Sequence, residues 1–152
     1  MGLMAEVSSL IQREAQLLDG NRYSEWLDLY TSDAIYQIPP GYPSAPDDTE
    51  GLQTILLDRR KLEDYAHRMS SGHAVVSHPP PRTVRLVSSP LACGESLFSV
   101  AWNLHLVRND ESSLFSGRTV YEIATEADRM KIRRKVVNVA NDSFSSGYMP
   151  LI

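Results

Sequence analysis

The apolar residues at the start of the chain recur with the period of an amphipathic helix. Between Leu3 and Leu18 they fall on one face of a helix with 3.6 residues per turn. Glu14 lies on that same face, and a carboxylate directed into a core needs a partner. Asp19-Gly20-Asn21 has the composition of a helix end followed by a turn. We therefore expect a helix over residues 3–18 that carries one acidic side chain inward.

The following fifty residues predict two more helices with a short strand between them. A short helix is expected over residues 23–30, and alternating residues predict a strand over 34–38, which Pro39-Pro40-Gly41 ends. Asp47-Asp48-Thr49 offers helix N-cap candidates. A long helix is predicted from there to about Met69.

The second half of the chain changes to the period-two alternation of strands. Its alternating segments are residues 83–89, 97–108, 114–124 and 130–140, with 73–77 as a candidate fifth strand. Asn109-Asp110-Glu111 and Glu126-Ala127-Asp128 have the composition of hairpin turns. Helices followed by a meander of strands predict an α+β fold, with the helices packed on one face of a curved antiparallel sheet. We expect residues 1–152 to form a single domain.

The alternation also assigns faces in two of these strands. In the strand over 97–108 the large residues point one way; they are Phe98, Val100, Trp102, Leu104 and Leu106. In the last strand, Arg134 falls on the face of Ile132 and is expected to meet Glu14. The opposite face carries a basic row of Lys131, Arg133 and Lys135. That row is either solvated or, with His105 of the polar strand face, a subunit contact.

Aromatic residues are gathered in the predicted helices and strands. Trp26, Tyr30, Tyr36 and Trp102 are candidates to line a pocket, together with Arg134. Core packing is the alternative interpretation of the same aromatic residues.

Charge and length narrow the range of functions. The chain has 152 residues, and 15 basic against 19 acidic residues give a net charge of −4. A mildly acidic chain without a basic cluster predicts no nucleic-acid binding. No apolar run reaches the roughly 18 residues of a membrane span, and the N-terminus lacks a signal-peptide core. A cytoplasmic protein without a membrane contact is expected.

The supply of metal ligands is small. Cys93 is the single cysteine, so the chain has no intrachain disulfide and no set of thiolates for an iron–sulfur cluster. The histidines are His67, His73, His78 and His105, and none forms the i, i+4 pair of a helical zinc site. We expect no metal and no cofactor in this chain.

Several short stretches, in order along the chain, resemble one protein family. They are residues 14–19, 23–27, 33–39, 58–68, 71–74, 81–83, 87–89, 117–118, 121–123 and 131–137. Together they resemble the small (β) subunit of bacterial aromatic-ring-hydroxylating dioxygenases, over most of the chain.

The resemblance implies a cone-shaped α+β fold like that of nuclear transport factor 2 and steroid isomerase. It also implies a mainly structural role and a large (α) subunit as the partner, with this chain forming either a homotrimer or the small-subunit part of an α3β3 hexamer. That partner holds a Rieske [2Fe–2S] cluster and a mononuclear iron. The residue inventory agrees, because Rieske ligation needs two cysteines and two histidines and this chain has one cysteine.

The same cone fold also occurs in isomerases, dehydratases and cyclases, so a stand-alone enzyme is the alternative. The steroid isomerase pattern places its aspartate base on Ile38, which cannot abstract a proton. A dehydratase-like site is still open and would use Glu14, Tyr36, His67 and His73. A third possibility is a pocket that binds a small molecule without chemistry. An open pocket with a perturbed acid or base would indicate an enzyme, whereas large interfaces would indicate a subunit.

Overall fold

The computed structural model describes residues 2–39, 55–71, 81–141 and 152. The helices within these ranges are α1 (Leu3–Asp19), α2 (Tyr23–Leu27) and α3 (Arg59–Ser70). The strands are β1 (Tyr30–Ile38), β2 (Ile55–Asp58), β3 (Arg82–Val87), β4 (Leu91–Gly94), β5 (Leu97–Arg108), β6 (Glu111–Glu126) and β7 (Arg129–Val139). They form one sheet in the order β2-β1-β7-β6-β5-β3, with β4 paired to β5.

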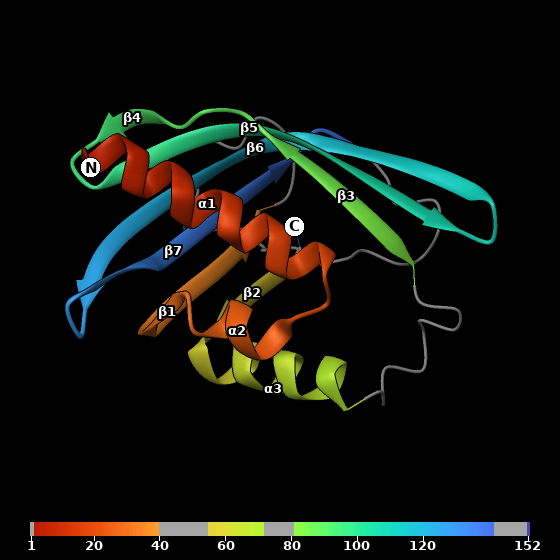
Figure 1. Ribbon diagram of the computed structural model, residues 1–152, viewed down its shortest axis with the longest axis horizontal. Coiled ribbons are helices and arrows are strands. Elements are labelled where there is room, and N and C mark those ends of the chain that lie inside the picture. Colours follow the sequence, from red (N-terminus) through yellow and green to blue (C-terminus); the bar gives the residue numbers. More distant parts are fainter. Residues whose placement is uncertain (1, 40–54, 72–80, 142–151) are drawn as a thin grey trace.

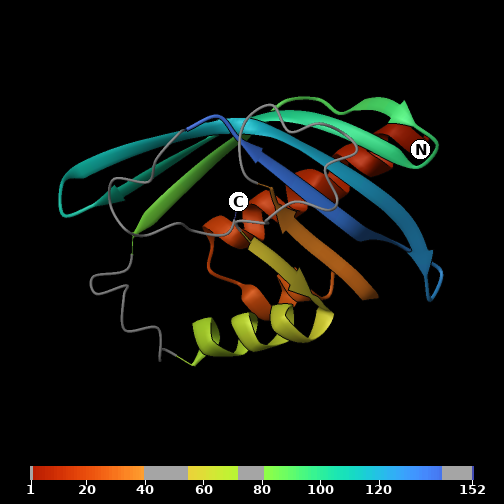
Figure 2. The ribbon, with the colours of Figure 1, turned by 180° about the vertical axis from the view of Figure 1, so that it is seen from behind.

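The sheet curves over α1, which crosses its inner face, while α2 and α3 lie near β1 and β2 (Figure 1). Figure 2 shows the same arrangement from behind, with the C-terminal residue near the middle of the molecule. The apolar side chains of these elements join in one buried cluster. This is the predicted α+β class, with one difference: β1 and β7 run parallel, and the other paired strands are antiparallel.

The end of α1 is attached to the far edge of the sheet. Asp19 Oδ1 accepts a hydrogen bond from Thr83 Oγ1 at 2.9 Å, and Asp19 Oδ2 accepts one from the Arg85 backbone N–H at 3.0 Å. Asp19 also forms an ion pair with the Arg85 guanidinium. These contacts fix the position of α1 across the concave face, and therefore the height at which Glu14 meets the sheet.

The first predicted helix and the longest predicted strand are confirmed. The first helix extends over residues 3–19, and Glu14 is buried on its inner face. The strand over 97–108 has the predicted bounds, and its five large alternating residues all face the core.

Two helix predictions need correction. Tyr30 begins β1 instead of ending the second helix, which stops at Leu27. Residues 55–58 of the predicted long helix form β2, and α3 begins only at Arg59. The reason is local: the Asp58 side chain caps α3 by accepting from the Lys61 backbone N–H at 2.9 Å. The predicted start at 47–54 and the candidate strand at 73–77 lie outside the described residues.

The strand β4 was not predicted, because its four residues are exposed and show no alternation. Within the described ranges, no helix has both the length and the apolar character that a membrane crossing needs.

A β-bulge at Arg133 reverses the predicted faces of β7 from Arg134 onward. Ile132 pairs with Ile123 and Arg134 pairs with Glu122, so Arg133 has no opposite residue in β6. Such an extra residue shifts the alternation by one position. The prediction that Arg134 points inward is therefore wrong: Lys135 is buried, and Arg134 is only half-buried.

Candidate functional site

Glu14 is the centre of a buried polar network beneath the sheet. Its Oε2 accepts hydrogen bonds from Trp26 Nε1 at 3.1 Å and from the Tyr30 hydroxyl. Its Oε1 accepts from the Tyr121 hydroxyl at 2.7 Å and from Lys135 Nζ at 2.9 Å. A carboxylate has about four lone-pair positions, so these four donors use its whole acceptor capacity.

The four donors also set the charge state of the site. Burial by itself raises the pKa of Glu14, but the Lys135 charge and the hydrogen bonds from Tyr30, Lys135 and Tyr121 lower it below its usual range. Burial, with the nearby Glu14 charge, raises the pKa of Tyr30 and of Tyr121 well above normal, so both phenols stay protonated and donate. Burial lowers the pKa of Lys135, and the Glu14 charge opposes that effect.

Lys135 links this network to Ile152. Its Nζ donates to the backbone oxygen of Ile152, to which the Tyr36 hydroxyl also donates at 3.1 Å. The Ile152 N–H in turn donates to the Tyr36 oxygen at 3.0 Å. The ammonium lies 5.5 Å from the ring centre of Tyr36 and 5.4 Å from that of Tyr121, within the range of cation–π attraction.

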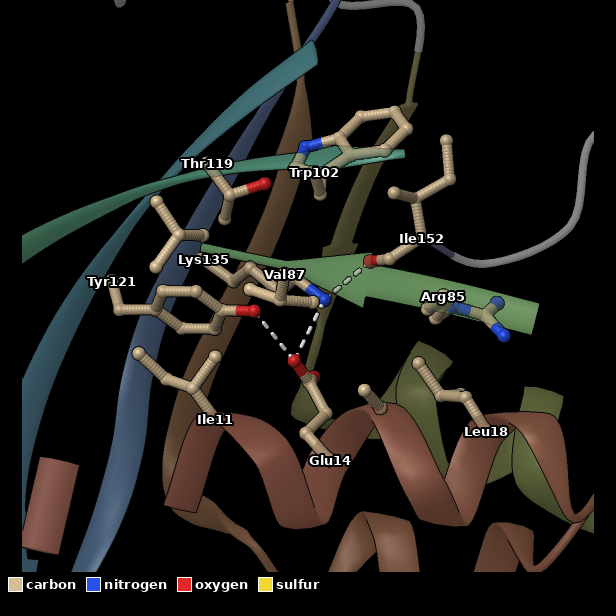
Figure 3. A pocket seen from close by; sticks show the side chains of 12 residues that line it. Ile11, Glu14, Leu18, Arg85, Val87, Trp102, Thr119, Tyr121, Lys135 and Ile152 are labelled. Carbon is tan, nitrogen blue, oxygen red and sulfur yellow. Dashed lines mark hydrogen bonds and ion pairs between the residues drawn. The ribbon is translucent and has the colours of Figure 1, made fainter. Parts of the chain in front are cut away.

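A small cavity remains beside Ile152, between α1 and the sheet (Figure 3). Its volume is about 20 Å³, which is room for about one water molecule. Trp102 Nε1 and Thr119 Oγ1 are buried at its lining and have no hydrogen-bond partner among the described residues. The interior is thus nearly filled, and Ile152 is one of the buried side chains that fill it.

The comparisons with known proteins agree with this architecture. The family model described as "Ring hydroxylating beta subunit" matches residues 13–146. This chain belongs to that family. The small subunit of anthranilate 1,2-dioxygenase from Acinetobacter baylyi is 30% identical, with 92% of this chain and 91% of the relative covered.

Solved structures place this family member in the same fold. The β subunit of benzoate 1,2-dioxygenase from Burkholderia mallei is 26% identical with a TM-score of 0.72, and 93% of each chain is covered. A chain of naphthalene 1,2-dioxygenase with indole bound in its active site is 17% identical with a TM-score of 0.72. That match covers 95% of this chain and 82% of the other, and it shows the likeness of fold alone.

The predicted pocket residues of this β-subunit family member lie in different places. Trp102 lines the cavity. Trp26, Tyr30 and Tyr36 are buried and hold Glu14 or Ile152 by hydrogen bonds. Arg134 is absent from the lining, because the bulge directs its Nε to Gln37 Oε1 at 2.7 Å.

Three residues of the network, Tyr121, Lys135 and Ile152, are not predicted as site residues by the sequence pattern. Tyr121 carried a usable signal, because alternation in β6 places it on the face of Phe115. Lys135 required knowledge of the bulge. Ile152 had no signal, since nothing in the pattern indicates that this residue enters the core.

The alternative catalytic set is only partly assembled. Glu14 accepts a hydrogen bond from Lys135, whose Nζ lies 5.5 Å from the ring centre of Tyr36. His67 is exposed on α3 and does not line the cavity, and His73 lies outside the described residues.

The described part of this family member does not fit an iron centre. In residues 2–39, 55–71, 81–141 and 152, no three histidine, cysteine or acidic side chains gather as metal ligands. Cys93 is exposed on β4. Neither a Rieske cluster nor a mononuclear iron finds its ligands among these residues.

The predicted interface residues differ in how far they are exposed. The prediction that Lys135 lies at a subunit interface is wrong, because its side chain is 2% exposed and paired with Glu14. Arg133 is exposed and lies 3.5 Å from Asp33, and the mostly buried Lys131 lies 3.8 Å from Glu126. His105 is exposed on the outer face of β5.

Proposed function

We propose that this chain is a non-catalytic, structural subunit that supports the large subunit of an aromatic-ring-hydroxylating dioxygenase. In this proposal the Rieske [2Fe–2S] cluster and the mononuclear iron belong to the large subunit. The two chains assemble in the cytoplasm as an α3β3 hexamer. The family membership supports the proposal, since the anthranilate and benzoate relatives carry the names of dioxygenase subunits.

The observation that carries the proposal is the state of Glu14. A general base needs a free lone pair within reach of a substrate proton. All four acceptor positions of Glu14 are occupied by Trp26, Tyr30, Tyr121 and Lys135, and the cavity beside them has room for about one water. The full occupancy of the Glu14 carboxylate supports a structural role for this buried network more than a catalytic one.

The outer face of the sheet supports a role in assembly. Val84, His105 and Leu114 lie directly beside one another across β3, β5 and β6. Val84 is 61% exposed and Leu114 is 51% exposed, and Leu86 adds a third aliphatic side chain at 67%. Adjacent exposed aliphatic residues are typical of protein contact surfaces. We assign these four residues, the outer patch, to the contact with the large subunit.

Co-expression of the tagged chain with the large subunit of its own host tests the proposal. We expect an equimolar complex whose visible absorption reports an iron–sulfur cluster. The tagged chain alone should be colourless. If a colourless homo-oligomer is recovered even in the presence of the large subunit, the subunit proposal is wrong.

A further inference from the structure

The small cavity between α1 and the sheet is lined by polar groups that have hydrogen-bonding capacity left over. We propose that this cavity is the binding site of one water molecule, held by Trp102 Nε1, Thr119 Oγ1 and Lys135 Nζ. The water joins β5, through Trp102, to the hydrogen-bond network of Glu14. This inference goes beyond the subunit role, because it concerns a ligand that the chain binds in its own interior.

The first argument is a pair of buried polar atoms. Trp102 Nε1 and Thr119 Oγ1 line the cavity, and neither has a hydrogen-bond partner in the part of the chain that the structure describes (Figure 3). Buried polar groups in folded proteins are nearly always hydrogen-bonded, either to the protein or to ordered water. A single partner inside the cavity accounts for both atoms.

The second argument is the third N–H of Lys135. An ammonium group carries three donors. Lys135 Nζ uses one of them on Glu14 Oε1, at 2.9 Å, and a second on the backbone oxygen of Ile152. Because Lys135 also lines the cavity, its remaining N–H is available to a molecule bound there.

The third argument is the position of these residues in the sheet. Trp102 in β5 pairs with Gly117, which lies two residues before Thr119 in β6. Lys135 in β7 pairs with Tyr121, which lies two residues after Thr119. The three polar residues therefore form one diagonal row across the inner face. Diagonal neighbours in antiparallel strands have Cα atoms about 7–8 Å apart, a spacing that one bridging water can span.

The orientation of the indole ring fits this row. A Cβ on Gly117 would lie 2.7 Å from Cζ2 of Trp102, so this edge of the ring lies over β6. Cζ2 and Nε1 are bonded to the same ring carbon. The N–H of Trp102 is therefore on the side of the ring that faces the strand of Thr119.

Size and charge together favour water as the ligand. The cavity volume of about 20 Å³ exceeds the roughly 10–15 Å³ that one water needs and is too small for an organic ligand. Each cation of the lining already has a carboxylate, since Lys135 pairs with Glu14 and Arg85 pairs with Asp19. A chloride ion would add an unpaired charge to the interior, which is costly.

One water completes the hydrogen bonds of all three groups. Its oxygen accepts from the N–H of Trp102 and from the third N–H of Lys135, and one of its hydrogens is donated to Thr119 Oγ1. Three hydrogen bonds are the usual number for a buried water. The ammonium of Lys135 then has a partner for each of its three hydrogens.

A crystal structure of the full-length chain, at a resolution that shows ordered waters, tests the proposal. We expect one density peak in the cavity, at about 2.7–3.2 Å from Trp102 Nε1, Thr119 Oγ1 and Lys135 Nζ. A second crystal soaked in sodium bromide tests for an anion, because bromide is located by its anomalous scattering. We expect no anomalous peak in the cavity.

The deciding variant is Thr119→Val, which keeps the shape of the side chain and removes the hydroxyl. We expect the density peak to fall below half of its native occupancy, because the water loses the acceptor of its own hydrogen bond. Thr119→Ser is the matched control, since it keeps the hydroxyl and should retain the peak. If Thr119→Val does not fold, the native and Thr119→Ser crystals still decide whether the water is bound.

Three results would overturn the proposal. One is a native crystal in which surface waters are resolved and the cavity contains no density. Another is an anomalous bromide peak at the site, which would identify an anion site. The third is a peak of unchanged occupancy in Thr119→Val. Co-expression with the large subunit is a separate measurement, so failure here leaves the subunit role intact.

Discussion

Each face of the β-sheet carries an exception to the usual distribution of polar and apolar residues. The inner face meets a buried carboxylate and a buried ammonium, Glu14 and Lys135, each 2% exposed. The outer face presents the aliphatic side chains of the outer patch to solvent. The inner charges are completed by groups of the chain itself, whereas no described residue covers the outer patch. The chain's own groups thus complete the inner face, while the outer patch is left open, as the proposed contact with the large subunit requires.

Residues on the two faces contribute to the free energy of the protein in different ways. A buried charge is tolerated only when it is paired and hydrogen-bonded, so the inner face depends on every member of the network. Single exposed aliphatic residues are common and nearly neutral, and only their grouping indicates a contact. Substitutions on the inner face should therefore change folding, and those on the outer face should change assembly.

The largest effect is expected from removing one member of the buried ion pair. Glu14→Leu or Lys135→Met leaves an uncompensated charge in the core and should lower the free energy of unfolding by about 3–5 kcal/mol. The measurement is chemical denaturation at neutral pH. The double variant removes both charges and should be more stable than either single variant.

Arg133→Met is the matched control for this comparison, because Arg133 forms an exposed ion pair on the same strand. It should leave the denaturation midpoint unchanged. A double variant that is less stable than both single variants would contradict the view that the charges matter chiefly to each other.

A smaller loss is expected at Gly117, on the inner face of β6. A Cβ at this position would lie 2.0 Å from the Asn138 carbonyl oxygen and 2.7 Å from Cζ2 of Trp102. Gly117→Ala forces these neighbours apart and should cost about 1–3 kcal/mol of stability, as overpacking usually does. Thermal unfolding measures the loss, and an unchanged melting temperature would show that the two strands can separate at no cost.

Acid should weaken the inner face selectively. The pKa of Glu14 is lowered from an unfolded-state value of about 4.5, so its stabilising contribution is complete above that pH. The contribution is lost as the pH falls through the folded-state pKa. Glu14→Gln removes the titrating group and should flatten the dependence of unfolding free energy on pH below about 4.5. Equal slopes for the variant and the native chain would assign the acid sensitivity to other carboxylates.

The outer patch should show the smallest effect on folding. Val84→Thr with Leu114→Thr is expected to change the stability of the isolated chain by no more than about 0.5 kcal/mol per site. The same double variant should reduce co-purification with the large subunit. Val107→Thr, at an exposed aliphatic position of the sheet outside the outer patch, is the control variant for this co-purification. If the native and double-variant chains recover equal amounts of the large subunit, the partner binds elsewhere.

The parts of the fold that the sequence could predict are those in which apolar residues recur with the regular period of a helix or a strand. In β5 every second residue from Phe98 to Leu106 is large and apolar, so the face of each side chain follows from the pattern. Glu14 was also recognisable, since it interrupts an otherwise apolar helix face.

The predictions that were wrong concern structural features that leave no mark in the spacing of apolar residues. The bulge at Arg133 exchanged the expected roles of Arg134 and Lys135, because basic residues occupy both faces there and no apolar residue marks the shift. The segment 55–58 pairs with β1 although its apolar spacing also suits a helix. Ile152 completes the site through tertiary contacts alone.

The missing side chain of Gly117 also helps to set the register in which β5 and β6 pair. The hairpin of β5 and β6 pairs twelve consecutive positions, and a slip by two residues would keep every side chain on its proper face. In such a slip Trp102 would oppose Phe115 or Thr119, whose side chains fill the space that Gly117 leaves to the indole ring. One missing methyl group thus distinguishes the native strand alignment from alternatives that hydrophobicity cannot tell apart.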